Sequence, residues 1–166
     1  MYLTGTSGVG KTTVGEELRR RGYVVYDVDV DGLARWYDDE TGVELPMPDR
    51  RDDSWYAEHT YRLPPETVRR LAPADGITFI TGAVGNEDQI WDLFDLVIQL
   101  TLDAATLEGR LRARGSFGSS GDELARVLAW QRQADLDNVR YGARPVSADG
   151  PPGQVADLVL GVVGVK

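Results

Sequence analysis

The stretch Gly-Thr-Ser-Gly-Val-Gly-Lys-Thr-Thr at residues 5–13 has the residue types and spacing of a phosphate-binding loop. It lies between a short strand-like run at residues 2–4 and an apolar-periodic segment, so it should connect a strand to a helix. Successive backbone N–H groups can surround a phosphate at the positive end of the helix dipole. The pattern therefore predicts a nucleotide phosphate site made of Gly8, Val9, Gly10, Lys11, Thr12 and Thr13, in preference to a chance glycine turn before a helix.

The lysine of this stretch is unusual for the chain, because the only other lysine is Lys166, against 16 arginines. An ammonium is a compact charge on a flexible stem, and it fits between phosphates where a planar guanidinium does not. We therefore expect Lys11 to bridge the β- and γ-phosphates of ATP and the Thr12 hydroxyl to bind Mg²⁺.

Two carboxylates follow the second apolar run, at alternate positions in Tyr26-Asp27-Val28-Asp29. Alternation along a strand turns both side chains to the same side, at the carboxyl edge where parallel sheets bind ligands. We expect Asp27 to hold water on Mg²⁺ and Asp29 to accept a proton from an attacking hydroxyl or to fix the acceptor. Asp31, directly before Gly32-Leu33, is interpreted as a helix N-cap.

Arg110 and Arg114 lie one helical turn apart, with Leu107 and Leu111 facing the core. A glycine- and serine-rich segment follows them at residues 115–121. One guanidinium could stack on a base while the other neutralises the transferring phosphate. The alternative is a solvated basic face, which is the interpretation we give to Arg112.

Acceptor contacts are harder to assign. The single histidine, His59, and Arg62 three residues later are candidates, although a lone histidine is more often structural. Gly82 follows the third strand, where a glycine indicates either close approach to a ligand or a tight turn. The segment 32–62 also contains aromatic residues that could stack on a ligand or form a core: Trp36, Tyr37, Trp55, Tyr56 and Tyr61. It contains three arginines that could bind a phosphate on the acceptor: Arg35, Arg50 and Arg51.

The elements that must position these residues alternate between short apolar runs and helical patterns, which is typical of an α/β domain with a parallel sheet. We predict a three-layer P-loop fold with about five strands flanked by helices and a short lid. Strands are expected at residues 2–4, 23–28, 77–81, 96–100 and 145–147. Helices are expected at residues 11–21, from 31 onward through Trp36 and Tyr37, 65–71, 104–114, from 120 onward, and 153–163.

The chain has 166 residues, no cysteine and a formal charge of −9. One domain spanning residues 1–166 is expected, with an acceptor-binding insertion at 32–62 and a lid region at 110–121. Disulfides and thiolate metal sites are excluded, and a nucleic-acid partner is not expected from an acidic chain. Without a leader-like or spanning apolar run, we expect a cytoplasmic monomer or homodimer that contacts no membrane.

Taken together, the separated pieces resemble the small nucleoside monophosphate kinase-like P-loop phosphotransferases, which include adenylate, shikimate and gluconate kinases. The resemblance covers nearly the whole chain, and it is strongest to AAA-type, adenylate-kinase-like ATP-binding proteins of bacteria. It rests on the loop at 5–12, the Asp27-x-Asp29 pair, Gly82 in Thr81-Gly-Ala-Val-Gly-Asn86, Arg110-x-x-x-Arg114 and Asp149-Gly150-Pro151.

The resemblance implies that Arg110 stacks on adenine, that Arg114 is the lid arginine touching the phosphates, and that the backbone of Asp149 and Gly150 lines the adenine edge. The residues expected in catalysis are then Lys11, Asp29, Arg110 and Arg114. Two departures argue against shikimate as the acceptor: no Arg-Pro-Leu-Leu run occurs in the lid, and the third strand lacks a terminal aspartate.

Three functions compete. The first is a kinase that transfers the γ-phosphoryl group of Mg·ATP to a small-molecule acceptor such as a nucleoside, a nucleotide or a sugar-like metabolite. A GTPase switch would need a guanine-reading Asn/Thr-Lys-x-Asp element, which a chain without another internal lysine lacks. The remaining alternative is a nucleotide-dependent ATPase or binding protein that acts on a macromolecule.

Overall fold

The computed structural model describes residues 1–47, 52–72, 75–115, 118–119 and 121–165. Its centre is a five-stranded sheet in which every neighbouring pair is parallel. Across the sheet the strands run β2 (Val24–Asp27), β6 (Thr78–Thr81), β1 (Tyr2–Thr4), β7 (Val97–Thr101) and β8 (Arg144–Ser147). The α/β class and the strand count expected from the sequence are confirmed.

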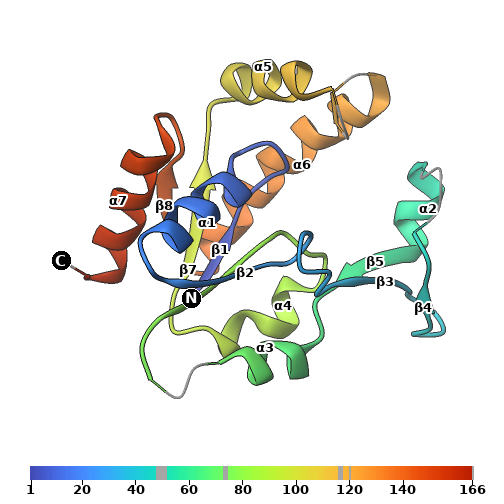
Figure 1. The fold of residues 1–166 in the computed structure, drawn as a ribbon. Helices are drawn as coiled ribbons and strands as arrows, with labels where there is room; N and C mark the ends of the chain where they lie inside the picture. The colour runs from blue at the N-terminus through green and yellow to red at the C-terminus, as the bar shows by residue number, and fades with distance from the viewer. Residues whose placement is uncertain (48–51, 73–74, 116–117, 120, 166) are drawn as a thin grey trace.

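Helices cover both faces of this sheet, because parallel neighbours must be joined by crossovers that bury the strands on two sides (Figure 1). The helices of the main body are α1 (Lys11–Arg20), α3 (Pro65–Leu71), α4 (Glu87–Ile90), the 3-10 turn η1 (Trp91–Leu93), α5 (Ala104–Arg114), α6 (Gly121–Arg140) and α7 (Pro152–Val163).

Strand alternation divides the core into two clusters. Leu3 packs with Leu18 of α1 and Val159 of α7 on one face, where the apolar residues of α5 also gather. Its neighbour Tyr2 faces the other side, where it packs with Val68 of α3 and Ile90 of α4. This is the three-layer arrangement expected from the sequence.

The segment between β2 and α3 forms a small unit that projects from the main body (Figure 1). It contains β3 (Arg35–Asp38), β4 (Glu44–Leu45), α2 (Asp53–Glu58) and β5 (His59–Arg62). The three strands pair antiparallel in the order β4-β3-β5.

The prediction of a helix from Asp31 onward is wrong, since Trp36 and Tyr37 lie in β3. The chain first turns at Asp31, whose N–H donates to the Asp27 carbonyl at 2.9 Å. Trp36 then pairs with Tyr61 of β5. Aromatic residues favour strands when a partner strand is available, and the partner here is 25 residues away, beyond the reach of local periodicity.

The remaining predicted helices agree with the structure to within a few residues, whereas α2, α4 and η1 were not predicted. None of the helices in the described part of the chain has both the length and the apolar character of a membrane-spanning segment.

Candidate nucleotide and acceptor site

The loop after β1 wraps tightly at its glycines. Gly8 has φ +88°, and a Cβ placed there would lie 2.7 Å from the Leu111 side chain of α5. Gly10 has φ +114° and is the N-cap of α1 in the left-handed region. A side chain would be strained at either residue, so the glycines allow α5 to pack directly against the loop.

The loop contains backbone N–H groups that other backbone groups leave unused. Val9 N–H donates to Thr6 O at 3.1 Å, and Val14 N–H donates to Gly10 O. Among the described residues, the N–H groups of Gly8, Gly10 and Lys11 donate to no other backbone group. Such donors at the N-terminus of a helix form an anion site, so the loop fits nucleotide phosphates.

The Lys11 side chain is folded onto this loop. Its Nζ donates to the carbonyl oxygens of Gly5 at 2.6 Å and Thr6 at 3.3 Å. Burial lowers the pKa of the ammonium, while the nearby carboxylates of Asp29 and Glu87 raise it. The amine is therefore held at the loop by two carbonyl groups.

Thr12 and Asp27 meet at the carboxyl edge of the sheet. The Thr12 hydroxyl donates to Asp27 Oδ2 at 2.9 Å, and Thr81 at the end of β6 donates to the same oxygen at 3.2 Å. Asp27 Oδ1 accepts from the N–H groups of Asp29 and Val30, so the buried carboxylate is held in one orientation. A threonine hydroxyl and a carboxylate are oxygen donors of the kind that Mg²⁺ takes alongside phosphates and water, so these two residues fit the ion.

Arg110 and Arg114 of α5 contact different residues of the loop after β1. Arg110 donates from Nη1 to Val9 O at 3.1 Å and from Nη2 to Ala148 O at 3.0 Å. Arg114 donates to the Ser7 hydroxyl at 3.2 Å. Arg112 instead turns outward to Glu108 at 2.7 Å, as its interpretation as a solvated residue requires.

Arg110 thus joins the phosphate loop to the connection between β8 and α7. The exposed Asp149 follows Ala148 there, and its N–H donates to the Ser147 hydroxyl at 3.2 Å. Gly150 comes next, before α7 begins at Pro152. Asp149 and Gly150 thus follow directly after the residue whose carbonyl accepts from Arg110.

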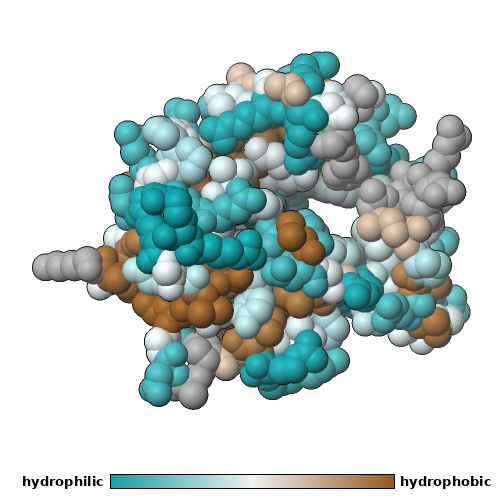
Figure 2. All heavy atoms as spheres, viewed as in Figure 1, coloured by the Kyte–Doolittle hydropathy of each residue, from teal (hydrophilic) through white to brown (hydrophobic). Residues whose placement is uncertain are grey.

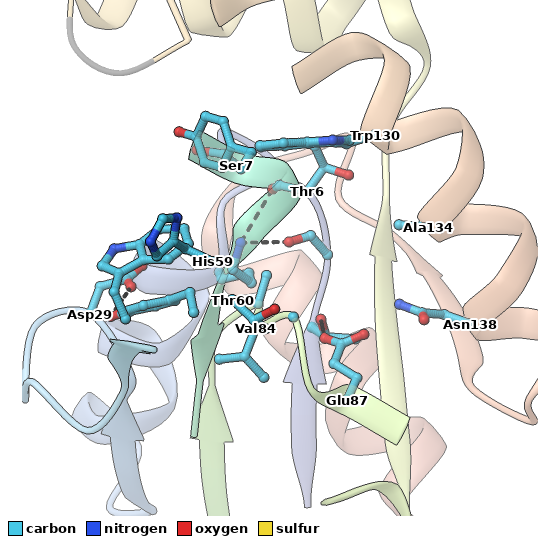
Figure 3. Close-up of a pocket in the computed structure, with 18 of the residues that line it drawn as sticks. Thr6, Ser7, Asp29, His59, Thr60, Val84, Glu87, Trp130, Ala134 and Asn138 are labelled. Atoms are coloured by element: carbon cyan, nitrogen blue, oxygen red, sulfur yellow. Dashed lines mark hydrogen bonds between the residues drawn. The ribbon is translucent and has the colours of Figure 1, made fainter. Parts of the chain in front are cut away.

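A cavity of about 550 Å³ opens beside the loop, between the main body and the insertion. Figure 2 shows the molecule hollowed between these two parts. Lys11 and Asp29 both line it, together with residues of β5 and of α6 (Figure 3). Trp130, Ala134 and Asn138 recur every four residues, so one face of α6 forms a wall of the cavity.

Asp29 is placed by the insertion as well as by β2. Its Oδ1 accepts a hydrogen bond from the Tyr61 hydroxyl at 3.1 Å. Burial, followed by the Asp29 charge, raises the pKa of Tyr61 far above its usual value, so the phenol stays a donor. The Asp29 carboxylate therefore lines the cavity with one oxygen held by Tyr61.

Glu87 also lines this cavity, and the sequence interpretation missed it. Its Oε1 accepts from the Thr4 hydroxyl at 2.7 Å and the Tyr2 hydroxyl at 2.9 Å. Burial raises the pKa of the carboxyl, while these hydrogen bonds lower it. The available signal was an acidic residue directly after Gly82-Ala-Val-Gly85-Asn86, at the carboxyl edge of the third predicted strand.

The other expected acceptor residues divide into two groups. His59 lines the cavity, with Nδ1 2.7 Å from Trp55 O and its ring stacked on Trp55 at 4.5 Å. Arg62 does not line it, because its guanidinium pairs with Asp39 at 2.5 Å and lies over the Tyr37 ring.

Gly82 is also absent from the cavity wall, unlike the next three residues. A Cβ at this position would lie 2.5 Å from the Val28 side chain. The glycine is thus required for packing of β6 against the end of β2. Of the three arginines expected to bind an acceptor phosphate, Arg35 lies 3.5 Å from Glu44, whereas Arg50 and Arg51 lie outside the described residues.

A glycine-rich loop between the first strand and the first helix, at the carboxyl edge of a parallel sheet, defines a P-loop nucleotide-binding protein. More narrowly, the chain belongs to the AAA domain family, which matches residues 2–127. Among curated proteins, none matches the chain significantly.

Solved structures share the fold over nearly all of both chains. A gluconokinase from Sinorhizobium meliloti 1021 is similar at 19% identity and a TM-score of 0.57, covering 98% of this chain and 90% of its own. A shikimate kinase from Aquifex aeolicus VF5 is similar at 19% identity and a TM-score of 0.60, covering 98% of this chain and 94% of its own. A deoxyadenosine kinase from M. mycoides with bound dATP gives 18% and 0.50, with 99% of each chain covered. The fold is that of the small P-loop proteins related to nucleoside monophosphate kinases.

Proposed function

We propose that the protein is an ATP-dependent phosphotransferase that moves the γ-phosphoryl group of Mg·ATP to a small-molecule acceptor. The observation that carries the proposal is that the cavity of about 550 Å³ shares Lys11 with the phosphate loop. A ligand there would meet the outer end of a nucleotide whose phosphates lie on the loop. Three structural relatives that are named as small-molecule kinases support the same activity.

The nucleotide is held by groups with distinct tasks. Loop N–H groups from Gly8 to Thr13 bind the phosphates, and the Lys11 ammonium leaves its carbonyl partners to bridge the β- and γ-phosphates. Arg110 stacks on adenine beside Asp149 and Gly150, and Arg114 neutralises the transferring group. Thr12 and, through water, Asp27 would hold Mg²⁺, which would neutralise charge on the phosphate oxygens.

Asp29 is the residue assigned to the acceptor hydroxyl. It lines the cavity, and the Tyr61 bond fixes one of its oxygens, which leaves the other to accept the proton of the attacking group. Transfer then depends on positioning and charge neutralisation, with no covalent intermediate on the protein.

Within residues 1–166 we propose one domain, in which the insertion at 32–62 closes the acceptor side and residues 110–121 form a short lid. His59 belongs to the acceptor wall in this scheme. Arg62 is assigned to the stability of the insertion through its pairing with Asp39 and Tyr37.

The test is release of ADP from Mg·ATP by purified protein, screened over nucleosides, nucleotides, sugars and small hydroxy acids. Lys11→Ala should abolish acceptor-dependent release. Lys11→Arg should lose at least about 100-fold, because a planar guanidinium does not replace a point charge between phosphates. The control is Arg112→Ala, which removes an exposed charge of α5 and should keep the full rate.

A slow rate that no acceptor changes, together with clear binding of Mg·ATP, would refute the transferase proposal. The same result would favour an ATPase or binding protein that acts on a macromolecule.

A further inference from the structure

The acceptor cavity has aromatic walls. Trp36, Tyr56 and Tyr61 come from the insertion, and Trp130 comes from α6. Their rings pack on one another. The ring centroids of Trp36 and Tyr61 are 5.2 Å apart, and those of Tyr56 and Trp130 are also 5.2 Å apart, with the two ring planes at 84° in an edge-on contact. The contacts hold the rings in place, so they offer flat apolar surfaces at little entropic cost on binding.

The Tyr56–Trp130 pair also joins the insertion to the main body. Beside it, Arg126 of α6 pairs with Asp53 of α2 and lies 4.9 Å from the centre of the Tyr56 ring. In Figure 3, Trp130 lies at the opposite end of the cavity from Glu87. A ligand between them would be covered by rings at one end and would reach a carboxylate at the other.

Two carboxylates are among the polar groups that line the cavity. Asp29 follows β2, and Glu87 is the first residue of α4, so the two carboxylates come from different elements. The bonds from Tyr2 and Thr4 both go to Oε1 of Glu87, and Asn138 of α6 also hydrogen-bonds the carboxyl group. A carboxylate offers about four acceptor positions, so Glu87 can still accept from a ligand. Two carboxylates whose environment is fixed in this way select hydroxyl or amino donors.

Within the described residues, three positive side chains near the cavity already have partners or a task. Lys11 serves the phosphates, Arg126 is paired with Asp53, and Arg35 lies 3.5 Å from Glu44. No arginine lines the cavity within the described ranges. An anionic acceptor would therefore face Asp29 and Glu87 with little compensation, which costs binding energy in a partly desolvated site.

We propose that the acceptor is a ring compound that carries hydroxyl or amino donors and no anionic group, stacked on the aromatic walls and bound through Asp29 and Glu87. This inference rests on the proposed transferase function and narrows it. It selects nucleoside- or amino-sugar-like chemistry over phosphorylated or carboxylated metabolites.

The test uses matched pairs of acceptors that differ by one anionic group: a nucleoside against its 5′-monophosphate, and a sugar or amino sugar against the corresponding sugar acid. Phosphorylated product is measured by mass spectrometry alongside ADP release. We expect kcat/KM to favour the uncharged or cationic member of a productive pair by at least about tenfold, since like charges across a recognition site are rejected.

Two variants locate the effect. Glu87→Gln and Trp130→Ala should each raise the acceptor KM by about 10- to 100-fold, as expected for loss of a charge-assisted hydrogen bond or of a stacking surface, with the Kd of Mg·ATP unchanged. The controls are Asp88→Asn on α4 and Leu136→Ala on α6, which are exposed neighbours outside the cavity. Circular dichroism and thermal unfolding check that all four variants fold.

Preference for the anionic member would overturn the inference while leaving the transferase function intact. Loss of acceptor binding in Arg50→Ala or Arg51→Ala, with Glu87→Gln unaffected, would overturn it in the same way. If no acceptor is phosphorylated, binding of the same pairs is followed by tryptophan fluorescence with a non-hydrolysable ATP analogue. Tighter binding of the neutral member then supports the inference although the transferase proposal has failed, and equal or reversed affinities refute it.

Discussion

The glycine at position 8 allows a sharp test of how the phosphate loop is held. Gly8 has φ +88°, and an added Cβ would lie 2.7 Å from the Leu111 side chain. Gly22, after α1, has φ +92°, and an added Cβ would meet nothing within 4 Å. Alanine at either position thus suffers nearly the same backbone strain, and only Gly8→Ala also suffers the clash.

The two terms can be estimated separately. A non-glycine residue at positive φ costs about 1–3 kcal/mol, and overpacking a filled core adds about 1–3 kcal/mol. The gain from a less flexible unfolded chain is similar in both variants and cancels in the comparison. For a chain of this size about 2–4 °C in Tm corresponds to each kcal/mol, so Gly8→Ala should melt about 2–12 °C below Gly22→Ala.

The assay is thermal unfolding with and without Mg·ATP. A nucleotide at about 100 times its Kd stabilises the folded state by about 2.7 kcal/mol, and this shift should persist in Gly22→Ala. The nucleotide-induced Tm shift should shrink or vanish in Gly8→Ala, because the loop moves away from Leu111 and its N–H groups no longer point at the phosphates. Equal Tm values and equal nucleotide shifts in the two variants would refute the idea that packing against α5 sets the loop.

Two further outcomes are expected. Arg110→Ala should weaken ATP binding by about 10- to 100-fold in calorimetric titrations, because it removes a stacking cation that bridges the two ends of the nucleotide site, whereas Arg112→Ala should leave the affinity unchanged. Hydrogen bonds from Arg20 and then Arg21 lower the pKa of Glu17 from 4.5 to about 2. A lowered folded-state pKa contributes stability that is present above about 4.5 and is lost as the pH falls toward about 2, so the Tm of Glu17→Gln should depend less on pH over that window, and parallel curves would contradict this origin.

Much of the nucleotide half could be predicted from the sequence because its signals are local. The loop at residues 5–13 combines glycines, a lysine and a threonine at fixed spacing. Their predicted roles depend only on neighbouring residues of the same loop. The helix face that carries Arg110 and Arg114 follows directly from a four-residue interval. The structure brings both arginines to the loop, with Arg112 outside.

The acceptor half could be predicted only in part, because its residues meet through long-range pairing. The aromatic segment after Asp31 looked helical, yet β3 pairs with β5 and carries Trp36 to Tyr61. Arg62 was expected to bind the acceptor, but its guanidinium forms an ion pair with Asp39. A sequence pattern shows which side chains a segment contains. It does not show which of these side chains will be paired with residues of another segment.

The sequence by itself determined the class of site: a phosphate loop, a lysine reserved for it, and carboxylates at the carboxyl edge of a parallel sheet. Tertiary structure decided what lies opposite. Glu87 becomes a site residue only because β1 places the Tyr2 and Thr4 hydroxyls against it, 83 or more positions away in the chain. The cavity likewise exists because α6 and the insertion approach each other, through contacts such as Tyr56–Trp130 that no local spacing encodes.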